Sequence, residues 1–306
     1  MNNKQTTWGI LLILISAIGY GLMPIASKLA YNVGTPVSTL LFSRFFIAGC
    51  FLWAYIFIKK IPYQVSGKHL MYLIGIGFFG FTLASIAIFK AYELMSGSVA
   101  TLILFAHPIF VVIIETTFLK MKLTRGKIFA MSLTALGLCL VVLTDDLKIT
   151  LLGVILSFVS SICYGFFCIG LTEKRTKQLG GVVVTAYVIL ASGSFNMIQC
   201  ISSGEPLFPT TGQGWLSVSI LAVFSTIIAS VCFYEGVQRI GAGNGTLIST
   251  TEPVITIILS FMFLHEPLTV NVIAGAVLII TSILLLSRNA SVVPVVENEA
   301  ETATHT

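Results

Sequence analysis

The chain has 306 residues, of which 56% are hydrophobic and only 9% are charged, and its mean hydropathy is +0.99. In soluble domains about a quarter of all residues are charged, so this composition excludes an ordinary soluble protein and indicates one that crosses a membrane many times. The net charge of +5 is distributed over short connections rather than gathered in one patch, so we expect no nucleic-acid partner.

Apolar segments follow one another along the chain, each about 20 residues long, which is the length that a bilayer requires. The first begins right after a short polar N-terminus; it is too long for a signal peptide and lacks a cleavage site, so we expect it to remain as a helix. The ten predicted spans are 8–29, 37–58, 69–92, 98–119, 125–143, 151–171, 182–201, 214–236, 243–264 and 269–287.

The positions of Lys and Arg predict the orientation of these spans, because cytoplasmic loops carry an excess of both. If the N-terminus is cytoplasmic, only Lys28 and Lys148 fall in or beside the outer loops. We therefore expect a multi-pass protein of the cytoplasmic (plasma) membrane, with both termini in the cytoplasm. The basic residues on the cytoplasmic side are Lys4, Lys59, Lys60, Lys68, Lys120, Lys122, Arg125, Lys127, Lys174, Arg175, Lys177, Arg239 and Arg288.

The two halves of the chain repeat each other. WGILLILISAIGYG at Trp8–Gly21 resembles LGVILSFVSSICYG at Leu152–Gly165, an offset of 144, and further matches continue at 145. Each half holds five crossings, an odd number, so the second half must run upside down relative to the first. We expect an all-α membrane protein of ten transmembrane helices built as two inverted five-helix repeats, an architecture typical of secondary transporters with a site near the midplane. The predicted parts are a cytoplasmic N-terminus at 1–7, repeats at 8–143 and 151–288, and a disordered cytoplasmic tail at 289–306.

The ninth span, 243–264, carries Glu252 near its middle, directly before Pro253. A carboxylate at bilayer depth costs several kcal/mol, so it normally faces the bundle interior or a watery cavity. We expect Glu252 to bind a substrate amine or to carry a coupled proton; the alternative is a protonated carboxyl that only packs. It belongs to one polar stripe of a helix, formed by Gly245, Ser249, Glu252, Thr256 and Ser260.

His107-Pro108 occupies the matching position in the first half, where His107 could titrate near neutral pH, donate a hydrogen bond to substrate, or only pack. Tyr20 and Tyr164 are repeat mates on serine-bearing stripes, and each can line a cavity or pack. The candidate substrate-binding or coupling residues are Glu252, His107, Tyr20, Tyr164, Ser85, Ser230, Ser249, Lys90 and Arg44, and the candidate hinges are Pro24, Pro108 and Pro253.

The remaining charged residues have simpler interpretations. Arg44 can neutralise a substrate carboxylate or pair with an acid for assembly, and we favour the structural role. Lys90 and Glu93 can pair at i, i+3, Glu235 and Arg239 form a predicted solvated pair at i, i+4, and Lys28 is expected to reach outward to the interface.

Several apparent motifs do not indicate catalysis. The GxGxxG pattern at 75–80 lies inside a span and follows no strand, so we interpret it as helix packing. His265-Glu266 lacks the second histidine of a zinc-protease motif. The six cysteines lie in apolar spans without metal-ligand spacing, so we expect free thiols, no metal and no cofactor.

The chain resembles the ten-helix EamA-type permeases of the drug/metabolite transporter superfamily over residues 8–288. The resemblance is carried by the SAIGYG and SSICYG openings of the two halves, Ser43-Arg44-Phe45, and IGAGNGTLISTTEP followed by FMFLHEPLT. His107 departs from the second half, which has Glu252 there. The resemblance implies transport of a small metabolite, amino-acid-like or another small organic solute, through a cavity lined mainly by helices 1, 3, 4, 6, 8 and 9, with export as the preferred direction.

We therefore expect a secondary transporter that works by alternating access, as a monomer or a homodimer in the bilayer. Proton antiport, exchange driven by another gradient and passive uniport all stay open at this point. The alternatives from other classes are an intramembrane enzyme acting on a lipid head group, which would need an acid/base pair or a metal site, and a channel-like or assembly subunit.

Overall fold

The computed structural model describes residues 3–117, 123–143, 149–171, 176, 179–240, 248–249 and 251–290. Throughout these ranges the regular structure is helical, and eight helical stretches are long and apolar enough to cross a membrane. Two shorter apolar helices, Thr251–Leu264 and Val270–Leu285, follow. The predicted all-α, ten-span architecture is confirmed. Residues 243–247 of the ninth span and 291–306 of the predicted tail lie outside the described ranges.

The helices of the first half are α1 (Asn3–Gly21), α2 (Met23–Tyr31), α3 (Val37–Ile58), α4 (Gly67–Gly75), η1 (Ile76–Thr82), α5 (Leu83–Leu94), α6 (Gly97–Leu104), α7 (His107–Thr117) and α8 (Arg125–Val142). Those of the second half are α9 (Leu151–Gly170), α11 (Gly181–Ser203), α12 (Gly212–Ser219), η2 (Ile220–Ile228), α13 (Ala229–Ile240), α15 (Thr251–Leu264) and α16 (Val270–Ala290).

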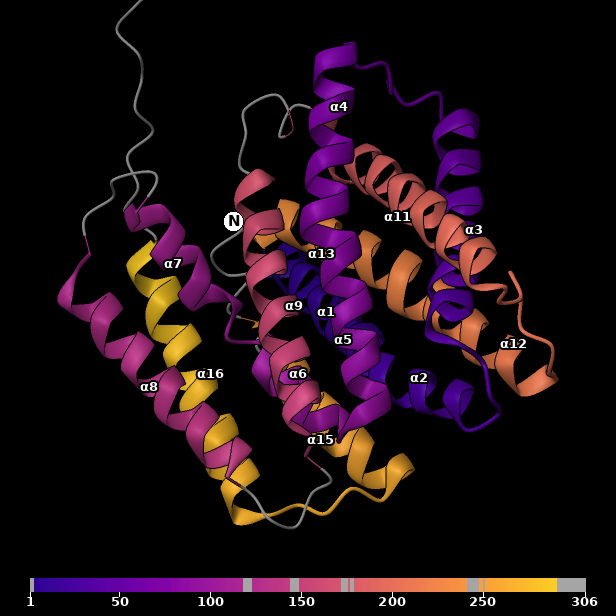
Figure 1. The fold of residues 1–306 in the computed structure, drawn as a ribbon. Helices are drawn as coiled ribbons and strands as arrows, with labels where there is room; N and C mark the ends of the chain where they lie inside the picture. Colours follow the sequence, from indigo (N-terminus) through magenta and orange to yellow (C-terminus); the bar gives the residue numbers. More distant parts are fainter. Residues whose placement is uncertain are drawn as a thin grey trace, which may run out of the picture.

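The packing pattern is preserved when the two halves are exchanged (Figure 1). The first helix, α1, packs on α13, and their repeat mates α9 and α5 pack on each other in the same way. The second helix of each half meets its mate in the α3–α11 pair, the fifth helices meet in α8–α16, and α6 touches α15. This exchange symmetry is what two inverted five-helix repeats produce.

Two spans are each divided into two helical pieces. α1 ends at Gly21 and α2 starts at Met23, with Pro24 at its N-terminus. α6 ends at Leu104 and α7 starts at His107, so Pro108 lies in the first turn of α7 rather than at the mid-helix point that the repeat alignment predicts. Proline fits the first turn because the N–H that it lacks has no helical partner there.

Both repeats carry a π-helical segment at the same place, η1 in the third helix and η2 in the eighth. In each, a threonine hydroxyl donates to the carbonyl five residues earlier: Thr82 to Gly77 at 2.9 Å and Thr226 to Leu221 at 2.8 Å. These two pairs differ by an offset of 144, so the π segments are repeat mates. Such segments are rare and occur frequently at functional sites.

Each π segment is also held by the other half of the chain. Thr82 shares a 2.7 Å hydrogen bond with Ser192 of α11, and the Nε of Arg44, on α3, donates to the Thr226 hydroxyl at 2.7 Å. We call these two cross-repeat hydrogen bonds the bulge contacts.

Glycine permits the closest helix contacts. A Cβ on Gly80 would lie 2.7 Å from Cβ of Phe167, and one on Gly137 would lie 2.8 Å from the carbonyl oxygen of Gly275. The first contact lies inside the GxGxxG pattern and confirms that it serves helix packing.

Candidate functional site

Glu252 lies on the face of α15 that packs into the bundle. Its side chain is half-buried, whereas Thr256 and Ser260, farther along the same face, are 1% and 0% exposed. α15 packs against α1, α2 and α6. At Gly21 of α1 a Cβ would lie 3.4 Å from the hydroxyl oxygen of Thr256, so these two helices touch there. The polar stripe predicted for this helix therefore faces the repeat interface over the part that is described.

Three tyrosines from three other helices lie within electrostatic range of Glu252. Tyr20 on α1, Tyr92 on α5 and Tyr164 on α9 all interact electrostatically with its carboxyl group. Their partners hold the first two phenols in place: Tyr20 Oη lies 3.1 Å from Ser230 Oγ, and Tyr92 Oη lies 3.2 Å from Thr101 Oγ1. We call Glu252 and these three tyrosines the central tyrosine cluster.

His107 adjoins this cluster through Tyr164. The two rings meet edge to face, with centroids 4.9 Å apart and an interplanar angle of 89°. His107 Nδ1 lies 3.1 Å from the carbonyl oxygen of Leu104. Because a carbonyl can only accept, Nδ1 carries the proton in this bond, and the hydrogen bond orients the ring at the start of α7.

Arg44 provides a buried positive charge near two of these tyrosines. It is 3% exposed, and it interacts electrostatically with Tyr20 and Tyr92, both of which also lie within electrostatic range of Glu252. Its Nε donates to the Thr226 hydroxyl, and its Nη2 lies 3.4 Å from the carbonyl oxygen of Ser225. Its Cζ lies over two aromatic rings, 5.3 Å from the ring centroid of Phe45 and 5.2 Å from that of Phe89.

The favoured acidic partner of Arg44 is not found among the described residues. The ion pairs in that part of the chain are Lys28–Glu266 and Glu235–Arg239. Hydroxyl, carbonyl and aromatic groups therefore take the place of the expected acid, which suits a weakly hydrated, planar guanidinium.

A comparison with known proteins finds the same two repeats. A model of the EamA-like transporter family matches residues 7–143 and again 151–288. The chain belongs to the EamA-like transporter family. It is a multi-pass membrane transporter rather than an enzyme, with a small-molecule substrate and the lipid bilayer as its surroundings.

Relatives span nearly the whole length of this EamA-like transporter. The uncharacterized transporter YcbK of Bacillus subtilis is 25% identical over 284 residues, covering 89% of this chain and 90% of that protein. An uncharacterized transporter of Archaeoglobus fulgidus is 23% identical over 288 residues, covering 92% and 98%. A solved crystal structure superposes with a TM-score of 0.65 at 16% identity, covering 92% of this chain and 98% of that one, and shows the same fold.

The other predicted site residues of the EamA-like transporter lie apart from the cluster or at its margin. Ser230 is joined to it through Tyr20, and Ser85 is buried on α5, 9% exposed. Ser249 is half-buried in a short described stretch. Lys90 is exposed, as is Glu93, and the predicted bond between them is not among the ion pairs of the described residues.

Two charged pairs test the simpler sequence interpretations. Arg239 Nη1 lies 2.6 Å from Glu235 Oε2 with both side chains well exposed, which confirms the predicted solvated pair. Lys28 does not simply reach outward: its side chain is 25% exposed and its Nζ lies 3.4 Å from Glu266.

Sequence reasoning missed Tyr92 and Glu266. Tyr92 could have been found, because it lies seven residues after Ser85 and therefore on the same helical face. Glu266 was considered only as part of a failed zinc motif, and its partners belong to the other repeat, which no local pattern indicates.

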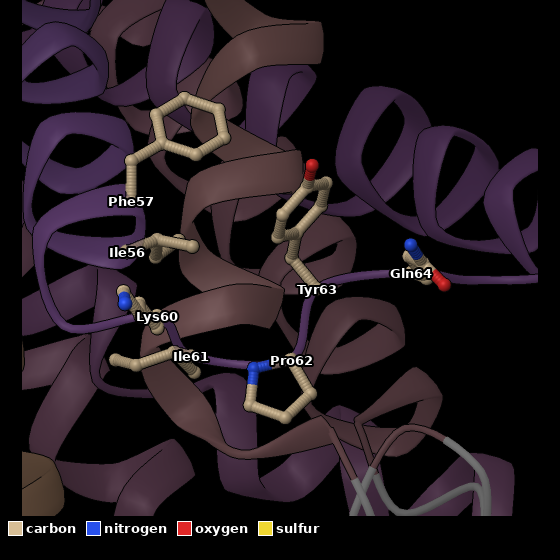
Figure 2. A pocket seen from close by; sticks show the side chains of 7 residues that line it. All are labelled: Ile56, Phe57, Lys60, Ile61, Pro62, Tyr63 and Gln64. Carbon is tan, nitrogen blue, oxygen red and sulfur yellow. The ribbon is translucent and has the colours of Figure 1, made fainter.

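Two hollows lie elsewhere on the molecule. The larger, about 650 Å³, is formed at the connection from α3 to α4 by Lys60, Tyr63 and their neighbours, which Figure 2 shows around it. The second, about 270 Å³, is an apolar groove between α3 and α11 that includes Trp53. Neither hollow shares a residue with the central tyrosine cluster. Among the described residues, no three His, Cys, Asp or Glu side chains gather as metal ligands would.

Proposed function

We propose that this EamA-like transporter is a secondary carrier that moves a small organic solute with a protonated amine, amino-acid-like or otherwise cationic, across the cytoplasmic membrane by alternating access. Export is the proposed direction, and Glu252 is the proposed binding or coupling group. The observation that carries the proposal is the half-buried carboxyl group of Glu252 on the face of α15 that packs against α1 and α6, with three tyrosines within electrostatic range.

The chemistry of the cluster supports an amine as the group recognised. A carboxylate on a transmembrane helix is costly unless it has a partner, and an ammonium ion supplies both charge and hydrogen-bond donors. Tyrosine faces add a favourable surface for a cation. The same carboxyl group is the candidate for a coupled proton, with substrate and proton competing for one site.

Arg44 supports a zwitterion over a simple cation. Tyr20 and Tyr92 interact electrostatically with both Arg44 and Glu252, so a positive and a negative group face the same two phenols. A solute with both charges would be complementary to that arrangement.

The break in the fourth helix supports alternating access. α6 and α7 are separated by Phe105–Ala106, next to His107, and α6 contacts α15, which carries Glu252. Inverted-repeat carriers place discontinuous helices at the substrate site, and the two repeats rock about it. With the basic residues of the loops on the cytoplasmic side, both termini of the chain are proposed to be cytoplasmic.

A thermal-shift screen of the purified protein against amino acids, nucleosides, sugars and organic cations tests the proposal. A ligand that binds only the folded state raises the melting temperature by mass action. We expect an amine-bearing ligand to stabilise the wild type and the control Glu235→Gln, which makes the same change on an exposed ion pair, but not Glu252→Gln. Equal stabilisation of Glu252→Gln would place the site elsewhere.

Counterflow in liposomes with that ligand then decides between a carrier and a channel. A carrier shows saturation and counterflow, whereas a channel-like subunit conducts without saturating. Transport that ignores an imposed pH gradient would count against proton coupling.

A further inference from the structure

Glu266 joins the two repeats at one end of the bundle. It lies in the connection from α15 to α16, belongs to the second repeat and is 9% exposed. The partners of its side chain all belong to the first repeat: Lys28 on α2 and the segment Ser96–Ser98, where α6 begins.

The carboxylate is fully engaged. Its Oε2 accepts hydrogen bonds from Ser96 Oγ at 2.6 Å, Ser98 Oγ at 2.7 Å and Ser98 N at 3.2 Å. Its Oε1 accepts from Gly97 N at 2.8 Å and lies 3.4 Å from Lys28 Nζ. Four hydrogen bonds, three to Oε2 and one to Oε1, and one ion pair therefore bind the carboxylate.

Glu266 replaces a cap that α6 could have provided for itself. Ser96 occupies the N-cap position, where a serine hydroxyl normally accepts from the backbone N–H groups of the first turn, but its side chain makes no capping bond. The free N–H groups of Gly97 and Ser98 are bound by the carboxylate from the other repeat instead. If Glu266 leaves, the Ser96 hydroxyl, which stands at the N-cap position and now donates to Glu266, becomes available to cap the helix.

The backbone of the connection from α15 to α16 allows the Glu266 side chain to reach the start of α6. His265 adopts a left-handed conformation with φ of 53°, which turns the chain at the end of α15. Gly97 lets α2 come close, because a Cβ there would lie 2.6 Å from Cβ of Pro24. Burial alone would raise the pKa of Glu266, but the hydrogen bonds from Ser96, Ser98 and Gly97 and the charge of Lys28 hold it below its usual value. The carboxyl group is therefore ionised at neutral pH.

We propose that Glu266, together with Lys28 and Ser96–Ser98, is a releasable latch that holds the two repeats closed at this end and opens when the transport site faces that side. α2, α6 and α15 contact one another around this latch. α6 ends shortly before His107, and α15 carries Glu252. Release would let these helices separate while Ser96 takes over the capping of α6. The role in the cycle rests on the proposed function; the existence of a releasable contact does not.

Distance measurement between spin labels tests the release without any substrate. Labels at the exposed positions Asn32 and Leu268 report on the two sides of the latch, in a chain whose native cysteines are replaced, reconstituted in nanodiscs. We expect a short distance to predominate with Glu266 intact, and Glu266→Gln to raise the longer-distance population roughly tenfold, as loss of a charged hydrogen-bond set implies. An unchanged distance distribution would overturn the proposal.

The matched control is Glu205→Gln. Glu205 is also a loop carboxylate of the second repeat, half-buried, and it accepts a hydrogen bond from a serine hydroxyl of the first repeat, that of Ser38 on α3 instead of α6. This variant should leave the distances between the labels unchanged.

Hydrogen exchange separates release from simple unfolding. In Glu266→Gln the amides of Gly97 and Ser98 should exchange roughly tenfold faster, while those of Thr101–Leu104 keep their protection. Exchange that accelerates along all of α6 would show that Glu266 is only a structural cap, and it would overturn the latch. Failure of counterflow with the latch behaviour intact would instead overturn the transport proposal.

Ser96→Ala tests the spare cap. If Ser96 takes over when Glu266 leaves, the double variant Ser96→Ala, Glu266→Gln should speed exchange of the Gly97 and Ser98 amides by more than the product of the two single-variant effects. Additive effects of the two changes would exclude the exchange of caps.

Discussion

The two repeats have the same arrangement of helices but differ in their charged residues. Both carry a π segment at the same position, and in both a threonine of that segment bonds to a helix of the other repeat. In the first bulge contact the partner of Thr82 is the neutral hydroxyl of Ser192; in the second, the partner of Thr226 is the buried guanidinium of Arg44. The fourth and ninth helices differ in the same way: His107 occupies in the fourth helix the position that Glu252 occupies in the ninth.

This difference indicates how a duplicated fold acquires a polar site. The symmetric parts, the π segments and the exchange of helix contacts, set the architecture. The asymmetric residues, Arg44 and Glu252, each lie within electrostatic range of Tyr20 and Tyr92. Matched substitutions at repeat-related positions can therefore separate architecture from site.

The largest contrast should appear between Glu252→Gln and His107→Gln. The first change removes the only carboxyl group placed in the cluster and should abolish counterflow of the ligand found in the screen, with the folded yield unchanged. The second removes a ring that contacts Tyr164 and should slow counterflow about fivefold, as expected for one neutral contact. Equal losses in both variants would mean that the two halves contribute alike.

Removing the Arg44 side chain should be the most damaging change to stability. Arg44→Ala takes away the donors to Thr226 and Ser225 and leaves a gap between Phe45 and Phe89, at a cost of about 3 kcal/mol. Ser192→Ala, in the other bulge contact, should cost about 1 kcal/mol. Melting curves of the two variants in the same detergent compare them, and a larger loss for Ser192→Ala would refute the contrast.

Thr226→Val and Thr82→Val make the same change at the same position of each repeat. The first leaves a buried charged donor without its acceptor and should cost about 2 kcal/mol, whereas the second removes a neutral hydrogen bond and should cost about 1 kcal/mol. The order of the two melting temperatures is the result to record. Indistinguishable values would show that the charge of Arg44 adds nothing to its bulge contact.

The smallest effect concerns the hydrogen bond between Tyr20 and Ser230. Ser230→Ala removes the partner of a half-buried phenol and should lower stability by about 0.5–1 kcal/mol. Binding of the ligand should weaken no more than about fivefold, since Tyr20 itself stays in place. A complete loss of binding would make Ser230 a direct substrate contact.

Much of the fold could be predicted from the sequence because lipid imposes a simple requirement. Each crossing must be a long apolar helix, so the spans are visible as continuous runs, and the match of SAIGYG with SSICYG reveals the repeat. An odd number of spans per repeat then leaves inversion as the one arrangement. The π segments were not predictable, because they depend on one extra residue per turn that changes no hydropathy pattern.

The site was predictable in part. Glu252 and His107 are conspicuous as polar residues in apolar spans, and the tyrosines mark the first helix of each half. Which of these meet was not predictable: Tyr20 reaches Ser230, and Tyr164 reaches His107, across helices far apart in the chain. The acid expected for Arg44 is not found among the described residues, where threonine, carbonyl and ring groups contact it.

The sequence by itself determined that this protein is a two-repeat membrane transporter and which ionisable residues it keeps at bilayer depth, because the cost of burying charge in lipid makes each one visible. Only the tertiary structure decided that Glu252 lies within electrostatic range of three tyrosines, that Arg44 bonds to Thr226 and Ser225 and has no acidic partner among the described residues, and that Glu266 caps a helix of the other repeat. Those contacts join residues from opposite halves, and the distances between them depend on how the helices pack, which no local pattern of residues records.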